Sequence, residues 1–130
     1  MAEEKKRVLV IDDDPMIRGL VQAMLEAEGY EVTLAEDGLK GIEVLEKEPQ
    51  PITFSFVVLD VIMPGMNGLD VLTRMKLHPN TSNLPVLMLT GEDKAEDMMA
   101  GYSVGADLYI TKPFTRQQLL RGVEIVTKGA

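Results

Sequence analysis

The sequence contains no cysteine and only one histidine among its 130 residues. Without cysteine there can be no disulfide scaffold, thiolate zinc site or cysteine nucleophile, and one histidine cannot form a multi-histidine metal site. No apolar run is long enough to span a membrane, and the basic residues 5–7 precede an apolar run too short for a signal peptide. We therefore expect a soluble, cytoplasmic protein without membrane insertion.

Positive charge is also scarce, because 13 Lys and Arg residues face 21 Asp and Glu residues, for a formal net charge of −8. This acidic excess argues against direct binding to nucleic acid or to an anionic membrane surface, but it is compatible with binding of cations or basic partners. The hydrophobic content of 45% is enough for one core. We expect a single domain over residues 1–130, with its core at about 6–127 and no room for an effector domain.

Five apolar runs typical of strands alternate with stretches of helical periodicity. The runs are residues 8–11, 31–35, 56–59, 86–89 and 108–110, and the helical stretches carry their apolar residues from Ile17, Leu39, Leu69, Ala95 and Leu119 onwards. This alternation predicts an α/β fold in which five helices cover both faces of a five-stranded parallel sheet. The first, third and fourth runs are apolar throughout and belong in the middle, which gives the strand order 2-1-3-4-5 of a flavodoxin-like, doubly wound sheet.

Two aspartates stand where helices are expected to begin. Asp14 precedes Pro15, a pair that fits the cap and first position of a helix, so we interpret Asp14 as an N-cap rather than a metal ligand. Asp37 can cap the second helix in the same way, and Pro49 and Pro51 end that helix.

Polar residues follow four of the predicted strands. Asp12 and Asp13 follow the first strand, Asp60 the third, Thr90 the fourth and Lys112 the fifth. Ligands of open parallel sheets bind at this carboxyl edge, near the point where the strand order switches. Several carboxylates in one place repel one another unless a cation neutralises them, and an all-oxygen donor set favours Mg²⁺. The sequence therefore predicts a Mg²⁺ site there.

Four blocks resemble the receiver domain of two-component response regulators. They are residues 8–13 (VLVIDD), 57–68 (VVLDVIMPGMNG), 87–91 (LMLTG) and 105–114 (GADLYITKPF). The blocks occur in the family's order and cover essentially the whole chain. One departure is the stretch 48–55, which looks a few residues longer than the family's usual link into the third strand.

The resemblance implies a phosphorylation-controlled signalling switch. Asp60 would accept a phosphoryl group from a histidine kinase or a small acyl phosphate. Asp13, Asp60, the backbone carbonyl of Ile62 and, through water, Asp12 would hold Mg²⁺, and Lys112 would pair with Asp60 and then with the phosphoryl oxygens.

The resemblance also implies how the signal leaves the site. Thr90 would bind a phosphoryl oxygen, Tyr109 would then move inward, and output would pass through the face formed by the fourth helix, the fifth strand and the fifth helix. Lys112–Pro113 resembles the family's cis peptide. Partners would be a histidine kinase or phosphotransfer protein and an output protein or effector domain, and the chain would be a monomer or a phosphorylation-linked dimer. It would not be an enzyme apart from its own phosphorylation and autodephosphorylation.

Alternatives remain at this stage. A phosphate sink or phosphorelay intermediate would use the same site residues. A Mg²⁺-dependent phosphohydrolase with an aspartyl-phosphate would need an acid at position 62, where Ile62 stands, and a pseudo-receiver would have lost an acid or the lysine. Two interpretations of Tyr109 also stay open: it is a half-buried aromatic residue of an edge strand, or its ring rotates inward when Thr90 moves.

Overall fold

The computed structural model describes residues 6–91 and 102–128. The strands are β1 (Arg7–Ile11), β2 (Glu31–Ala35), β3 (Phe54–Asp60), β4 (Val86–Thr90) and β5 (Leu108–Thr111). The described helices are α1 (Pro15–Glu26), α2 (Gly38–Lys47), α3 (Gly68–Leu77) and α5 (Arg116–Lys128). Most of the predicted fourth helix lies outside the described residues, and only its end at 102–104 is described, with helical backbone.

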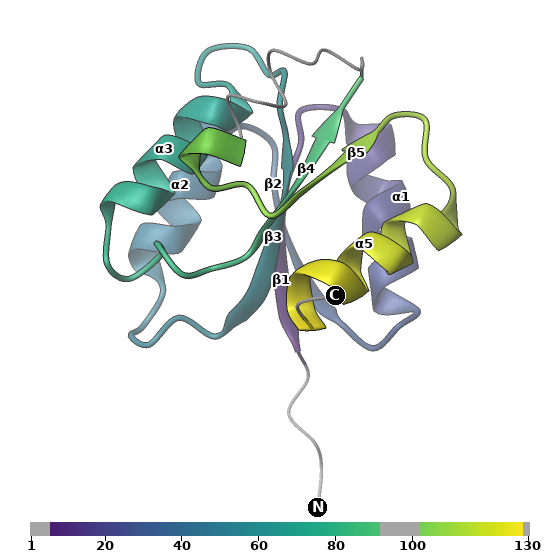
Figure 1. The fold of residues 1–130 in the computed structure, drawn as a ribbon, viewed down its shortest axis with the longest axis horizontal. Helices are drawn as coiled ribbons and strands as arrows, with labels where there is room; N and C mark the ends of the chain where they lie inside the picture. Colours follow the sequence, from purple (N-terminus) through teal and green to yellow (C-terminus); the bar gives the residue numbers. More distant parts are fainter. Residues whose placement is uncertain (1–5, 92–101, 129–130) are drawn as a thin grey trace, which may run out of the picture.

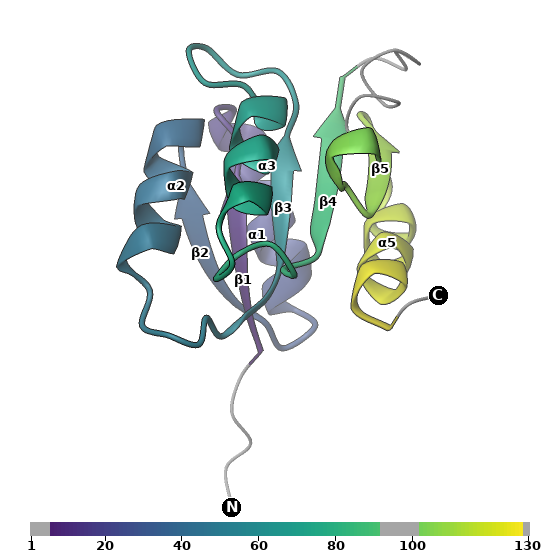
Figure 2. The same cartoon turned by 60° about the vertical axis from the view of Figure 1, so that its left-hand side comes forward.

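All five strands are parallel and lie in the order β2-β1-β3-β4-β5, as predicted. Figure 2 shows them side by side and pointing the same way. Every residue of β4 is buried, as are the last four residues of β1, whereas β2 and β5 keep exposed positions. The burial pattern confirms that β2 and β5 are the edges.

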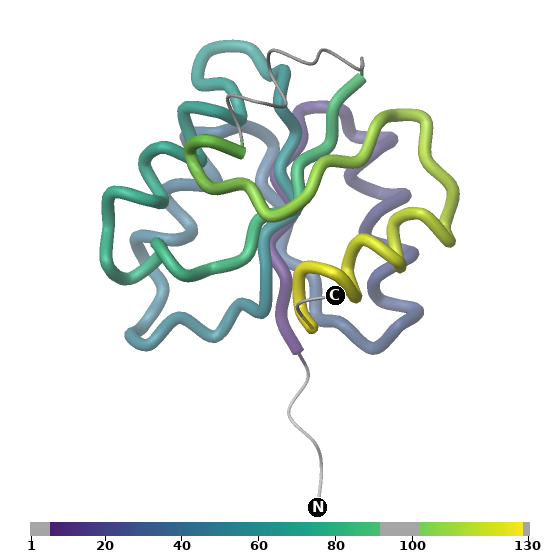
Figure 3. Tube along the Cα trace, viewed as in Figure 1, coloured from purple at the N-terminus to yellow at the C-terminus, as the bar shows by residue number. Residues whose placement is uncertain are grey.

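The helices cover both faces of this sheet. Helices α1 and α5 lie on one face and α2 and α3 on the other (Figure 1), and the tube in Figure 3 shows the chain crossing between the two layers. Alternate residues of β1 serve the two faces: Leu9 and Ile11 belong to the core cluster under α2 and α3, and Val8 and Val10 to the cluster under α1 and α5. This double burial explains the continuous apolar runs of the central strands.

The predicted helix caps are confirmed. Asp14 is the N-cap of α1, where its carboxylate accepts from the Met16 amide at 2.9 Å, and Pro15 is the first helical residue. Asp37 caps α2 by accepting from the Lys40 amide at 2.8 Å. No described helix is both long and apolar enough to cross a bilayer.

Strand β3 begins earlier than predicted, at Phe54, so Ser55 belongs to the strand and not to the link before it. The reason is a contact with β1. The guanidinium of Arg7 lies 4.2 Å from the centre of the Phe54 ring and donates to Thr53 Oγ1 at 2.7 Å and to Glu48 Oε1 at 2.6 Å. These contacts hold the start of β3 against β1 although its sequence is less apolar than the rest of the strand.

Candidate functional site

Four of the predicted site residues stand at the carboxyl ends of strands. Asp12 directly follows β1, Asp60 ends β3, Thr90 ends β4 and Lys112 directly follows β5. Because the strands are parallel, these positions lie along one edge of the sheet. Asp12, Asp60 and Thr90 are at most 3% exposed, so these three polar side chains are largely removed from water.

Three carboxylates form a cluster here. Asp12, Asp13 and Asp60 each offer an oxygen, and these oxygens all lie within 4.8 Å of one another. Asp12 and Asp60 are buried while Asp13 is exposed. Asp14 is outside this group and serves α1 as its cap, which is the division that the sequence predicts.

Lys112 bridges two of the acids. Its Nζ donates to Asp12 Oδ2 at 3.0 Å and to Asp60 Oδ1 at 3.3 Å, and its side chain is 19% exposed. The Lys112–Pro113 peptide is cis, as the resemblance implies. One ammonium therefore faces three carboxylates, so the site has an excess of negative charge when all of them are ionised.

The electrostatics of the cluster follow from burial and crowding. Burial, and then the charge of Asp12, raise the pKa of Asp60 to about 7 against the opposing effect of Lys112. Burial lowers the pKa of Lys112, but its hydrogen bond with Asp12 and the charges of Asp60 and Asp12 outweigh this, and the net pKa lies above its ordinary value. Lys112 is thus a permanent cation, whereas Asp60 changes its protonation near neutral pH.

Thr90 connects to Lys112 through the main chain. The Lys112 amide donates to the Thr90 carbonyl at 2.6 Å, and Thr90 itself is 2% exposed. The ends of β4 and β5 are therefore joined at the residue that carries the ammonium, so a displacement of one strand end reaches the other.

Arg18 supports the cluster, although we did not predict it from the sequence. Its Nη1 donates to the backbone carbonyl of Asp12 at 2.7 Å, while Asp12 Oδ1 accepts from the Asp14 amide at 2.9 Å. The loop between β1 and α1 is held from both sides by these bonds. One feature of the sequence could have indicated this role: Arg18 lies in the first turn of a helix that begins directly after the run of aspartates.

Gly68 fixes the segment that follows Asp60. Its amide donates to the Val61 carbonyl at 2.8 Å, and a Cβ at this position would overlap the Asp60 carbonyl oxygen. Ile62, whose carbonyl is a predicted ligand, lies in this segment and has a side chain that is 56% exposed. The absence of a side chain at Gly68 lets α3 begin directly against the end of β3.

The donor set fits a hard divalent cation. The cluster supplies only carboxylate oxygens, and its exposed member, Asp13, faces solvent while the other two are fixed by Lys112 and by backbone groups. Mg²⁺ prefers oxygen ligands and keeps several water molecules, so a partly open set of acids suits it. Asp12, Asp13 and Asp60 are the side chains that could hold it.

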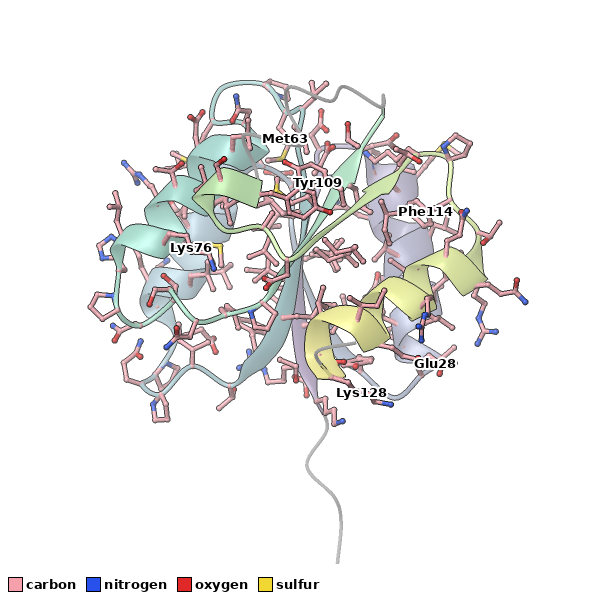
Figure 4. All side chains as sticks on the ribbon, in the orientation of Figure 1. Glu28, Met63, Lys76, Tyr109, Phe114 and Lys128 are labelled. Carbon is pink, nitrogen blue, oxygen red and sulfur yellow. The ribbon has the colours of Figure 1, made fainter. Side chains whose placement is uncertain are left out.

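Tyr109, the second predicted switch residue, is buried in this structure. It is 8% exposed, belongs to the core cluster under α2 and α3, and pairs with Met88 across the strands. Figure 4 shows it on the α3 side of the sheet, with Phe114 on the side of α1 and α5. The ring is therefore more deeply buried than the half-buried aromatic expected of an edge strand, and its predicted inward rotation on phosphorylation stays a prediction.

Comparison with known protein families gives a match over most of the chain. The family model of the response regulator receiver domain matches residues 8–124. That range includes all the site residues described above.

Individual proteins agree with this match. The chain is 42% identical over 132 residues to the probable transcriptional regulatory protein TcrX of Mycobacterium tuberculosis, covering 95% of this chain and 54% of that protein. Among solved structures, the chemotaxis protein CheY4 of Vibrio cholerae has a TM-score of 0.86 and 32% identity, covering 95% of this chain and 99% of that one.

A third similar protein, the receiver domain of the sensor histidine kinase PA1611 of Pseudomonas aeruginosa, has a TM-score of 0.84 and 25% identity, covering 96% of this chain and 99% of that one. Its structure has a magnesium ion coordinated in the active site cleft. The chain spans about half the length of the curated relatives it matches.

Proposed function

The chain belongs to the response regulator receiver family, and we propose that it is a switch controlled by Mg²⁺-dependent phosphorylation of Asp60. The observation that carries the proposal is the placement of Asp60, which is 3.3 Å from the Lys112 ammonium and in one cluster with Asp12 and Asp13. The donor is a histidine kinase, a phosphotransfer protein or a small acyl phosphate. The reaction takes place in the cytoplasm, within one domain.

Asp60 is the nucleophile of the proposed reaction. An oxygen of its ionised carboxylate forms a bond to phosphorus, the bond from phosphorus to the donor's nitrogen or oxygen breaks, and that electron pair leaves with the donor. Asp12, Asp13 and Asp60 would hold Mg²⁺, which would supply positive charge to offset the acids and the phosphoryl oxygens. Because the pKa of Asp60 is about 7 without metal, a cation also favours the ionised, nucleophilic form.

Lys112 and Thr90 bind the oxygens of the phosphoryl group on Asp60. Lys112 already donates to Asp60, so its ammonium needs only a small movement to pair with a phosphoryl oxygen on the same residue. The Thr90 hydroxyl, at the adjacent strand end, donates to another phosphoryl oxygen. Phosphorylation adds about −1.5 to −2 charges, which strengthens both interactions.

Output passes through the face formed by the fourth helix, β5 and α5. The bond between the Lys112 amide and the Thr90 carbonyl links the site to β5, and Tyr109 lies two residues before Thr111 at the end of that strand. The relatives of about twice this length are transcriptional regulators, which supports an effector domain or a separate output protein as the partner. The switch acts as a monomer or as a phosphorylation-linked dimer, without direct contact of this domain to nucleic acid.

A phosphate sink or phosphorelay intermediate is the second candidate. The observation that favours it is that Tyr109 is already buried, since a domain that only passes on phosphate needs no movement of this residue. A phosphohydrolase is disfavoured because the exposed, apolar Ile62 stands where that reaction needs an acid.

The deciding experiment is phosphorylation by acetyl phosphate, followed by intact mass measurement. We expect one phosphoryl group on the parent chain with Mg²⁺, none in EDTA, and none on Asp60→Asn. Asp37→Asn is the matched control, because it removes an acid while asparagine preserves the cap of α2. Unchanged labelling of Asp60→Asn, or full labelling in EDTA, would contradict the proposal.

A further inference from the structure

The outer edge of β5 is closed by a tyrosine side chain. The Lys112 amide, just after this strand, donates towards β4, to the Thr90 carbonyl. The Tyr109 amide instead donates to the Tyr102 hydroxyl at 3.2 Å. The outward amide of an edge strand is usually left to water or to another chain. Here a residue from the end of the fourth helix takes it.

The same tyrosine also contacts the Tyr109 side chain. The ring centres of Tyr102 and Tyr109 are 5.1 Å apart with an interplanar angle of 62°, an edge-on contact. Tyr102 is 45% exposed and Tyr109 is 8% exposed. The outer ring thus covers the inner one, and a single side chain holds both the amide and the ring of Tyr109.

The turn between the two tyrosines is fixed at several points. Gly105 has a φ of 129°, which few other residues adopt, and a Cβ there would meet the side chain of Lys76. Asp107 accepts from the Val86 amide at 2.8 Å. With this turn held, the distance between Tyr102 and Tyr109 changes only when the helical turn at Tyr102 moves or when its side chain rotates away.

We infer that Tyr102 is a positioning residue that holds Tyr109 in its buried position before phosphorylation. Its hydroxyl stabilises the edge of β5 and its ring keeps the Tyr109 ring against the core. The consequence for signalling rests on the proposed function: because this contact already keeps Tyr109 inward, it limits the inward movement that phosphorylation of Asp60 can still cause.

Amide hydrogen exchange tests the contact without any phosphorylation. In Tyr102→Phe, which keeps the ring and loses the hydroxyl, we expect the Tyr109 amide to exchange roughly two- to tenfold faster. The Lys112 amide faces β4 and should keep its rate. Tyr30→Phe is the matched control, because Tyr30 also makes an edge-on ring contact, 5.4 Å from Phe56, in the other core cluster. Equal Tyr109 rates in parent and Tyr102→Phe would overturn the assignment.

The positioning role is tested by addition of beryllofluoride, a phosphoryl mimic, with Mg²⁺. If Tyr102 holds Tyr109 inward, the NMR shift of the Tyr109 amide on addition of the mimic should be larger in Tyr102→Phe, and larger still in Tyr102→Leu, than in the parent. Labelling of Asp60 by acetyl phosphate should stay within twofold in both variants. Equal shifts in all three proteins would overturn the positioning role, whereas absent labelling of the parent would contradict the proposed function and leave the exchange result standing.

Discussion

The Lys112 ammonium lies 3.3 Å from the Asp60 carboxylate, although their strands are not neighbours, since β4 lies between β3 and β5. The lysine side chain reaches over the end of β4, where the buried Thr90 stands. Its positive charge therefore connects the two halves of the carboxyl edge, and it offsets the charge of acids that stand on β3 and just after β1.

The stability of the metal-free protein should depend on the ionisation of Asp60. The pKa of Asp60 is raised to about 7, so the folded state binds this proton more tightly than the unfolded chain does. Stability is therefore lost as pH rises from the unfolded pKa towards 7, and the loss levels off above it. In EDTA above pH 7, Asp60→Asn should be more stable than the parent by about 1–3 kcal/mol, with little difference near pH 4. Urea melts at both pH values measure this, and a variant less stable than the parent at high pH would contradict the crowded site.

Removal of the Lys112 charge should destabilise the metal-free protein. Lys112→Met keeps the aliphatic side chain but leaves the buried Asp12 and Asp60 without their cation. We expect a loss of about 2 kcal/mol at pH 8 in EDTA, a smaller loss at pH 5 where Asp60 is protonated, and partial recovery with Mg²⁺. Lys128→Met, at the exposed end of α5 (Figure 4), is the control and should change stability by less than about 0.5 kcal/mol.

Binding of Mg²⁺ should distinguish two neighbouring acids. Asp13→Asn should weaken the affinity about tenfold or more, because Asp13 belongs to the carboxylate cluster. Asp14→Asn should leave it within about threefold, because Asp14 is a cap that asparagine replaces well. Calorimetric titration of both variants checks this. An equal loss of Mg²⁺ affinity in the two variants would show that the affinity depends on the local negative charge and not on coordination by Asp13.

Substitution by alanine should change the stability of the protein in opposite directions at two glycines. Gly68→Ala should lose about 1–3 kcal/mol, because the new Cβ overlaps the Asp60 carbonyl and α3 must shift away from β3. Gly19 lies within α1, where a Cβ would have nothing within 4 Å, so Gly19→Ala should gain up to about 1 kcal/mol. Thermal melts give both values. Gly68→Ala should also slow the labelling of Asp60, and normal labelling would mean that the segment tolerates the shift.

The proposed output face should report the phosphoryl mimic. Beryllofluoride with Mg²⁺ should perturb the NMR signals of β5 and of Tyr102 more than those of α2. Helix α2 packs against β2 and β1, at the opposite end of the sheet from β5. In a complex with an output partner, Tyr109→Ala should uncouple binding from phosphorylation while Asp60 is still labelled. Changes confined to the loops at Asp13, Asp60 and Thr90 would favour the phosphate sink or relay.

Much of this arrangement was predictable because it follows from periodic patterns. The apolar runs indicated the strand order, since a strand buried on both faces has no polar positions, and the parallel order then brought Asp12, Asp60 and Lys112 to one edge. The role of Asp14 was predictable because the cap and the following proline are local features.

Two contacts that escaped prediction join a side chain to the main chain of a neighbouring element. The bond from Arg18 to the Asp12 carbonyl and the bond from the Tyr109 amide to the Tyr102 hydroxyl depend on how a helix is placed beside a loop or strand, and such placement leaves no periodic pattern in the sequence. The early start of β3 escaped prediction for another reason, since Phe54 is held by Arg7, which is distant in the chain.

The separation of Asp12 and Lys112 along the chain has a consequence for biosynthesis. The two residues that meet at 3.0 Å are 100 positions apart, so the site does not exist until β5 has added to the edge of the sheet. A nascent chain still held in the ribosome at that point presents Asp12 and Asp60 without their ammonium. Under the proposed function, competence to accept phosphate thus arises only after nearly the whole domain has emerged and folded, so Asp60 labelling would measure complete assembly of this domain.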